Sequence, residues 1–577
     1  MPQISSKLNT LIKQALKDLS IQIDDIHLEH PAEIEHGDFS TNVALALAKT
    51  EKKNPRELAK DIAAKIASYQ DETIERVETA GAGFVNFFLS RSFYTRVIES
   101  GLQAPERIGH TEALRNKKVL IEYTDPNAFK VFHIGHLMAN AIGESVARTL
   151  EFSGASLVRL CYPSDIGLHI AKAIWGMKKN EHDSPKETDS LTAKTNFLGT
   201  AYVLGTKMYE EDPVVKEEIN GLNKKLFEKS DPAVNRLYEK GREWSLDHFE
   251  ELYKKLGTKF DRYIFESEVA DKGRLIVEEY LGRGCFEKSE GAIVFKGEEH
   301  GLHTRVFITA KGLPTYESKE IGLNFKKFEL YPCTDSSIII TGNEQNEYFK
   351  VLKRVLSIIA PNIGEKTHHV SHGMMRFADG KMSSRTGNVV TAEHLLSAVE
   401  ALVHQKIADR ELVDNEKNKI ADIVAVGAIK FSILRQAIGG DIIYDFDKSI
   451  SFEGDSGPYL QYSYTRARSV IEKAKGVGMK THLETKSPSL NVEVYVLEKW
   501  LYRFPEVVTR AGQEFAPHYL ATYLLELSSA FNAFYAEHKI VDLDDSEAPY
   551  RLALTEVFAA TMKNGLYLLG IKAPERM

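Results

Sequence analysis

The sequence predicts a multidomain α/β protein with three parts: an N-terminal α+β domain, a split α/β domain with parallel strands, and an all-helical C-terminal region. The chain of 577 residues is too long for a single hydrophobic core. A strand–loop–helix–strand pattern over residues 117–162 is typical of a βαβ unit, and almost unbroken helical periodicity follows Thr391. Hydrophobic residues make up 43% and charged residues 27%, which is ordinary for a soluble globular protein.

The first domain is expected to span residues 1–112. The segment 81–90 alternates and is rich in aromatic residues, which predicts a strand. Apolar residues recur at helical spacing in two other stretches, formed by Leu8, Leu11, Ile12, Leu16 and Leu19 and by Val43, Ala44, Leu47 and Ala48.

The second domain is expected over residues 113–395 and to be Rossmann-like. It begins with a β-rich run at 117–124, continues through a polar loop and a helix with one apolar face, and returns to a strand at 157–162. The chain then becomes more polar over about 172–300, which predicts an insertion. Alternating strand and helix patterns reappear after the insertion, with a strand expected at 305–310, a strand at 336–342 and a helix at 347–360. The α/β fold is therefore expected to be split into two halves.

The remaining chain is expected to be helical, with a connecting region at 396–452 and a helical bundle at 453–577. Only residues 475–489 have the composition of a clear loop.

Charge and cysteine content exclude several classes. The net charge of −8 excludes a generally polybasic surface, although a local basic face could still bind nucleic acid. Cys161, Cys285 and Cys333 lie far apart, which excludes a disulfide scaffold and disfavours a cysteine zinc site. No segment approaches the ~18 apolar residues of a membrane span, and the N-terminus lacks the apolar core of a signal peptide. We expect a cytoplasmic protein that does not enter a membrane.

A histidine pair lies where the first loop of the α/β domain enters its helix, in His133-Ile134-Gly135-His136. A helix N-terminus offers free backbone N–H groups to phosphate, Gly135 lets a flat ligand approach the backbone, and two imidazoles can donate to phosphoryl oxygens. The alternatives are a buried histidine pair or a zinc pair, for which the sequence shows no third ligand.

A second polar segment, Asp379–Asn388, is flanked by glycine and carries the run Lys381-Met382-Ser383-Ser384-Arg385. Small polar residues with two cations suit a mobile loop that closes on phosphates. Taken alone, the segment fits a solvated loop at least as well.

Together the two motifs resemble the HIGH and KMSKS signatures of class I aminoacyl-tRNA synthetases, in the right order and on a split α/β domain. Longer segments are similar to blocks of the arginyl-tRNA synthetase family and cover nearly the whole chain: HGDFSTNVALALAK, GAGFVNFFLS, EYTDPNAFKVFHIGHL, GLPTYESKEIG, TGNEQNEYFKVLK, EGDSGPYLQYSYTRAR and APHYLATYLLELSSAFNAFY. The chain is identified as a member of this family. The resemblance implies an additional tRNA-binding domain at the N-terminus and an anticodon-binding domain at the C-terminus.

The family activates arginine with ATP and transfers it to tRNA, so the resemblance implies an AMP-forming arginine–tRNA ligase. Because the nucleophile is already anionic, the enzyme must mainly align and neutralise the polyphosphate. The resemblance assigns catalysis to Lys130, His133, His136 and Lys381, and ATP binding to Gly135, Ser383, Ser384 and Arg385. How charge is shared between Lys130, Lys381 and Arg385 stays open.

Arginine recognition needs a carboxylate that can pair with a planar guanidinium. Tyr316 and Glu320 are four residues apart in a segment expected to be helical, and therefore lie on one face. The resemblance assigns both to the guanidinium, although the family usually has Asp at the Glu320 position; Tyr316 could instead be a half-buried structural residue. The arginine-binding set that the resemblance implies is Glu122, Asn127, His133, Tyr316, Glu320 and Gln345.

The implied partners are tRNA(Arg), L-arginine and ATP, with Mg²⁺ carried by ATP and no protein-bound zinc. Tyr459, Tyr462 and Arg466 fall on successive turns of one helix, and the resemblance assigns them to the anticodon; they could equally pack the helical bundle. His368, His369 and His372 could be metal ligands by type, but a structural or adenosine contact is the preferred interpretation because no acidic or cysteine ligand is near. The family further implies a monomer without an obligate protein partner, and tRNA binding before activation.

Three other classes remain as alternatives. A small-molecule nucleotidyltransferase would not need the helical C-terminal region. A non-catalytic RNA-binding paralogue would not need the intact histidines and lysines of the signatures. A synthetase for another amino acid is disfavoured by Tyr316 and Glu320, which suit a cationic substrate. The insertion is too small for an editing domain and shows no sequence pattern that would indicate one. Editing is also unnecessary, because bound lysine would leave polar groups of the arginine site unpaired and would therefore be rejected.

Overall fold

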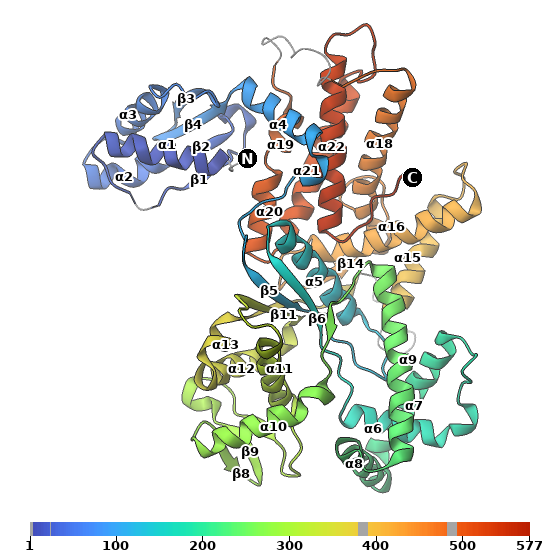
Figure 1. Ribbon diagram of the computed structural model, residues 1–577. Coiled ribbons are helices and arrows are strands. Elements are labelled where there is room, and N and C mark those ends of the chain that lie inside the picture. Colours follow the sequence, from blue (N-terminus) through green and yellow to red (C-terminus); the bar gives the residue numbers. More distant parts are fainter. Residues whose placement is uncertain (1–3, 24, 379–390, 482–492) are drawn as a thin grey trace. The chain divides into compact units, whose positions relative to one another are not determined.

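The computed structural model describes residues 4–23, 25–378, 391–481 and 493–577 (Figure 1). The chain forms two compact units. The first contains residues 1–110, 462–509 and 523–565, and the second contains residues 111–461, 510–522 and 566–577. Each unit is described by itself. None of the helices in the described part combines the length and the apolar run that a bilayer crossing requires.

The first unit contains a four-stranded antiparallel sheet in the order β1-β2-β4-β3. The strand predicted at 81–90 is confirmed as β4 (Phe84–Leu89), and the two helical stripes are confirmed as α1 (Ile4–Asp18) and α2 (Val43–Glu51). Their apolar residues pack against β4 in one buried core. The other elements of this part are β1 (Leu28–Glu29), β2 (Phe39–Thr41), α3 (Pro55–Ala67), β3 (Ile74–Ala80) and α4 (Arg91–Gln103).

The second unit is built on a five-stranded sheet in the order β12-β11-β5-β6-β7, and all its strand pairs are parallel. The predicted βαβ unit is confirmed as β5 (Lys118–Glu122), α5 (Ile134–Phe152) and β6 (Ser156–Cys161). The strand predicted at 336–342 is β11 (Ser336–Gly342), and it pairs with β5 on the side opposite β6. The strand order therefore reverses between β5 and β11, where ligands bind in open parallel sheets, at the carboxyl ends of the strands.

Two strands differ from expectation. The strand predicted at 305–310 is confirmed as β10 (Arg305–Ile308), but it does not belong to the parallel sheet. It lies in a separate antiparallel sheet with β9 (Ala292–Phe295) and β8 (Glu287–Ser289), because a short apolar run does not by itself reveal which strand it pairs with. The segment Thr367–His372 is polar and was not expected to be a strand, yet it forms β12 beside β11.

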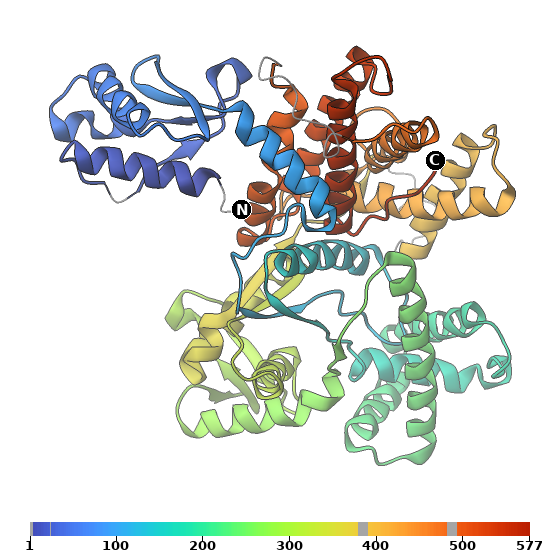
Figure 2. The same cartoon turned by 45° about the horizontal axis from the view of Figure 1, so that its top comes forward.

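Helices dominate the region that was expected to be an insertion. Figures 1 and 2 show α6 (Leu168–Lys179), α7 (Leu191–Glu211), α8 (Pro213–Glu228) and α9 (Pro232–Leu256) as a separate group beside the parallel sheet. Asp212 and Asp231 cap the first turns of α8 and α9, and a proline follows each cap, which explains where these helices begin. After the group, β7 (Arg262–Tyr263) returns to the edge of the sheet, and α10 (Glu266–Gly282) follows.

The second half of the α/β domain continues with α11 (Tyr316–Leu330), η5 (Asn343–Gln345), α12 (Asn346–Ile359) and α13 (Pro361–Lys366). The predicted helical region after Thr391 is confirmed, with the short strand β14 (Ile442–Tyr444) as an exception that pairs with β13 (Met375–Phe377). Its helices are α15 (Ala392–Lys406), α16 (Asp414–Leu434), α17 (Phe446–Ser449), α18 (Gly457–Gly476), α19 (Val496–Leu501), α20 (Phe504–Gln513), α21 (His518–Glu537) and α22 (Ala548–Leu568).

Candidate active site

The loop between β5 and α5 has an unusual backbone. Thr124, Asp125 and Phe129 all have positive φ angles, of 80°, 42° and 64°. The loop is held to the end of β6 because the Ala128 N–H donates to the Ser164 carbonyl (3.0 Å) and the Ser164 N–H donates to the Pro126 carbonyl (3.1 Å). Non-glycine residues in this conformation cost about 1–3 kcal/mol each and are characteristic of functional sites. The strain is concentrated where the strand order reverses.

His133 and His136 form a stacked pair at the start of α5. His133 is the N-cap, and the two ring centroids are 3.6 Å apart. The His133 backbone N–H donates to His136 Nδ1 (3.4 Å), so we assign the His136 proton to Nε2. Gly135 is needed beside them, because a Cβ there would lie 3.0 Å from the His133 ring.

Burial and the nearby positive charge favour the neutral form of both imidazoles. Burial lowers the pKa of His133, and the neighbouring Lys130 charge lowers it further. Burial lowers the pKa of His136 well below its usual value, with His133 and Lys130 adding to the effect. They can therefore act as hydrogen-bond donors to an anion while Lys130 supplies the positive charge.

Three buried carboxylates lie at the end of β5, at the start of α10 and on α11. Glu122 ends β5 and pairs with Lys327 (Oε2 to Nζ, 2.6 Å), and Glu266 pairs with Lys319. Glu320 also lies buried on α11, but among the described residues no cation pairs with it. The Asn324 amide donates to one of its oxygens over a long 3.5 Å.

The charges of these carboxylates repel one another. Burial raises the pKa of Glu320 to about 8, and the Glu122 charge is the next cause. Burial and Glu122 likewise raise the pKa of Asp125 well above its usual value. A buried carboxylate whose charge is destabilised in this way is ready to bind a cationic group, since such a group would offset both causes.

The remaining residues predicted for the arginine site differ in their exposure to solvent. Tyr316 begins α11 and is 55% exposed, and its ring centroid lies 4.4 Å from Lys319 Nζ. Asn127 is half-buried and pairs with Ser164 through the backbone. Gln345 is exposed at the end of η5. The structure thus brings the charges of Glu122 and Glu320 together and leaves Tyr316 and Gln345 exposed to solvent.

Sequence reasoning missed four residues of this site: Asp125, Glu266, Lys319 and Lys327. Lys327 carried a usable signal, because it follows Glu320 by two helical turns and so lies on the same face of α11. Glu266 carried none, since only the tertiary fold brings α10 beside α11.

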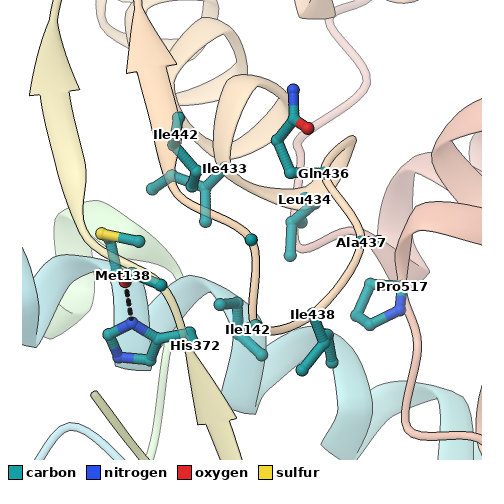
Figure 3. Close-up of a pocket in the computed structure, with 13 residues that line it drawn as sticks. Met138, Ile142, His372, Ile433, Leu434, Gln436, Ala437, Ile438, Ile442 and Pro517 are labelled. Carbon is teal, nitrogen blue, oxygen red and sulfur yellow. Dashed lines mark hydrogen bonds between the residues drawn. The ribbon is translucent and has the colours of Figure 1, made fainter. Parts of the chain in front are cut away.

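The chain approaches the KMSSR segment along one wall of a small cavity (Figure 3). Met138 and Ile142 of α5 face a loop that follows α16, and His372 and Gly373 complete this wall. A Cβ on Gly373 would lie 2.2 Å from the Gly440 carbonyl oxygen, so the two backbones are in direct contact. Lys381, Ser383, Ser384 and Arg385 lie outside the described residues.

Two of the three histidines of β12, His369 and His372, make contacts that fit the structural interpretation. His369 Nε2 hydrogen-bonds with Thr341 Oγ1 (2.8 Å), and its ring stacks on Phe349 with centroids 3.9 Å apart. His372 Nδ1 donates to the Gly373 carbonyl (2.8 Å). In the described part of the chain, no three His, Cys, Asp or Glu side chains gather as a metal site.

The residues predicted to bind the anticodon all lie on α18 and are half-buried. Arg466 donates to Asn532 Oδ1 (2.6 Å) and to the Tyr462 hydroxyl (3.3 Å), and its guanidinium lies 4.8 Å from the Tyr462 ring centroid. Tyr459 lies one turn before Tyr462. These contacts fix Arg466 and Tyr462 as a pair on the helix.

Comparison with known proteins identifies three matching segments. Residues 98–446 match the catalytic domain of class I (R) tRNA synthetases, residues 6–89 match the arginyl tRNA synthetase N terminal domain, and residues 460–577 match the DALR anticodon binding domain. An arginine–tRNA ligase of Lactobacillus johnsonii is 32% identical, with 98% of this chain and all of the relative covered. One of Clostridium perfringens is 30% identical, with 98% and 99% covered. The fold is that of the solved Thermus thermophilus arginyl-tRNA synthetase, with a TM-score of 0.79 at 24% identity over the full length of both chains.

Proposed function

The chain belongs to the arginyl-tRNA synthetase family of class I, and from this premise we propose how its residues divide the work. The enzyme is an arginine–tRNA ligase, which esterifies tRNA with arginine. The proposed catalytic domain is residues 113–395, with the insertion at about 172–300 inside it. Residues 1–112 and 453–577 are the proposed tRNA-binding domains, and the helical region 396–452 connects the catalytic domain to the second of them.

One observation supports the arginine site most strongly. Glu320 is a buried carboxylate without a cationic partner among the described residues, while Glu122 and Glu266 beside it are both paired with lysines. A guanidinium is the cation that fits, because its planar fork can donate two parallel hydrogen bonds to one carboxylate. Lysine would supply the charge without the fork and would leave buried polar groups unpaired.

The other substrate contacts follow the family. We propose that Tyr316 and Glu320 bind the guanidinium, that Glu122 and Asn127 hold the α-amino end, and that Gln345 and His133 complete the site. The pairing of Glu122 with Lys327 means that the α-amino group would compete with, or extend, an existing ion pair.

The triphosphate is proposed to lie over the start of α5. His133 and His136 would donate hydrogen bonds to phosphoryl oxygens as charge develops, Gly135 would admit the nucleotide, and Lys130 would neutralise charge. Lys381, Ser383, Ser384 and Arg385 are the proposed contacts of the β- and γ-phosphates. Mg²⁺ would enter with ATP and hold the polyphosphate in one geometry.

For tRNA, we propose that Tyr459, Tyr462 and Arg466 contact anticodon bases. Aromatic faces next to a guanidinium provide stacking surfaces for unpaired bases. We further propose that tRNA must bind before arginine is activated, that the enzyme acts as a monomer, and that it works in the cytoplasm, where its tRNA substrate is charged.

Charging of tRNA tests the proposed function. Purified protein should attach labelled arginine to tRNA that reads arginine codons, with ATP and Mg²⁺ present, and should not attach lysine. Retention of tRNA without any charging, by protein with a cooperative thermal transition, would favour the RNA-binding paralogue instead.

The KM for arginine should depend on pH through Glu320. The free carboxyl has a pKa of about 8, so at pH 7 most of it is protonated and must lose a proton when the guanidinium binds. Raising the pH from 7 to 8.5 should therefore lower the KM for arginine about eight-fold, since the binding form becomes dominant. Steady-state kinetics over this range with tRNA present measure the effect, and a KM that rises with pH would contradict it.

A further inference from the structure

The loop that carries Lys130 is anchored in the core of the insertion. Ala128 and Phe129 are fully buried, and they belong to the same hydrophobic cluster as the inward faces of α6, α7, α8 and α9. The conformation of the loop and the packing of the insertion are therefore parts of one core. We propose that the insertion positions Lys130 for the triphosphate, with Tyr202 of α7 as a positioning residue and α9 as the element that fixes the loop backbone. The inference rests on the proposed role of Lys130 as a phosphate-binding residue.

Helix α9 fixes the backbone at Phe129. The Phe129 N–H donates to Ser245 Oγ (2.9 Å), and this hydroxyl donates in turn to the Gly241 carbonyl (2.7 Å). A Cβ on Gly241 would lie 2.1 Å from the Phe129 ring, so the ring fits against bare helix backbone. The ring also stacks on Tyr238, with centroids 6.5 Å apart. These contacts compensate the positive φ of Phe129, which directs the chain into Lys130.

Helix α7 holds the side chain of Lys130. The Nζ atom lies 4.8 Å from the centroid of the Tyr202 ring, which is a cation–π contact. No carboxylate of the described residues forms an ion pair with Lys130, in contrast to Lys319 and Lys327. An aromatic ring attracts the ammonium without neutralising it, so the full charge stays available to phosphate.

The positive charge of Lys130 affects the pKa values of nearby histidines. It contributes to the lowered pKa values of His133, His136 and His169, which lie on both sides of the strained loop. The ammonium held over Tyr202 is therefore close enough to His133 and His136 to act on the proposed ATP site.

The chain offers a matched control on the same helix. Tyr209 lies two turns after Tyr202, is similarly half-buried, and its ring centroid lies 4.5 Å from Lys172 Nζ and 5.4 Å from Lys216 Nζ. Both tyrosines pack against the same core. Loss of Tyr209 therefore reproduces the loss of ring packing and of a lysine contact, away from the loop.

ATP–pyrophosphate exchange at saturating tRNA, with ATP and arginine varied in turn, tests the proposal. Tyr202→Leu should raise the KM for ATP about three- to five-fold with the KM for arginine unchanged, as expected for one lost cation–π contact. Tyr202→Phe, which keeps the ring, and Tyr209→Leu should both stay near wild type. An equal rise of the KM for ATP in Tyr202→Leu and Tyr209→Leu would overturn the positioning role of Tyr202. The proposed function would still stand in that case, provided that the wild type catalyses exchange.

A double-mutant cycle makes the test specific to Lys130. In a Lys130→Met background, Tyr202→Leu should have no further effect on the KM for ATP, because the group that it positions is already absent. The same fold-change in both backgrounds would overturn the inference.

Ser245→Ala tests the contact between α9 and the loop backbone. This variant should raise the KM for ATP, whereas Ser528→Ala, a substitution of another buried helical serine, should not. Equal effects of the two substitutions would remove α9 from the proposal.

Discussion

Replacement of Glu320 by glutamine is expected to raise the KM for arginine about 150- to 5,000-fold at pH 8.5, with little change in the KM for ATP. Glutamine keeps the shape of the side chain and removes its charge. The guanidinium would then lie buried without a counter-charge, and breaking one side of a buried ion pair costs about 3–5 kcal/mol. The pH dependence of the KM for arginine should flatten in the same variant, because the group that titrates near pH 8 is gone.

Glu329→Gln is the matched control for this prediction. Glu329 lies on the same helix, α11, but its side chain is 57% exposed and pairs with Lys272 at the surface. Its loss should leave both KM values within about two-fold, as expected for exposed ion pairs. If Glu320→Gln behaved like Glu329→Gln, the guanidinium would have to bind elsewhere.

Replacement of His136 by asparagine is expected to lower kcat for pyrophosphate exchange about 10²- to 10³-fold. In other enzymes, removal of one hydrogen-bond donor that stabilises a developing charge lowers kcat by this amount. The asparagine side-chain oxygen can still accept the His133 N–H, as His136 Nδ1 does, so the start of α5 should keep its cap. What disappears is the Nε2–H donor. Binding of arginine should be nearly unaffected, so the loss should be in kcat.

The pH profile adds a second criterion. Because burial keeps His136 neutral, its titration should not affect kcat of the wild type between about pH 6.5 and 8.5. His404→Asn, on α15, provides a helical histidine that is half-buried and outside the site. A kcat for His136→Asn equal to that of His404→Asn would exclude His136 from catalysis.

The hydrophobic pattern of the sequence predicted the strands and the helix on which the site residues lie. The apolar run at 117–124, the periodic face that follows and the strand at 336–342 became β5, α5 and β11, because each buries its own apolar residues in the core of the sheet. Glu122 lies within the run predicted as a strand, and β5 ends at this residue; its place in the arginine site was implied by the family resemblance and not by the pattern. The neighbouring strain at Thr124 and Asp125 did not follow from the pattern, since backbone conformation in a loop depends on the contacts that hold it.

The features that the sequence pattern could not predict depend on tertiary contacts, namely on which strands pair and on which segments pack together. β10 has an apolar run like that of β11, yet its partner is the antiparallel β9, and only the fold decides between them. β12 is polar, and its position beside β11 gives it strand geometry that its composition does not favour. The insertion carried no motif, but Tyr202 and Ser245 lie against the loop of Lys130 because that loop packs into the core of the insertion.

ATP–pyrophosphate exchange, measured with arginine in the presence and absence of tRNA that reads arginine codons, tests both the substrate and the order of binding. We expect exchange that requires arginine, is not supported by lysine, and occurs only when tRNA is present. Exchange with lysine at a rate near that of arginine would contradict the assignment of Glu320 to a guanidinium. Exchange with arginine alone would remove the proposed requirement for tRNA.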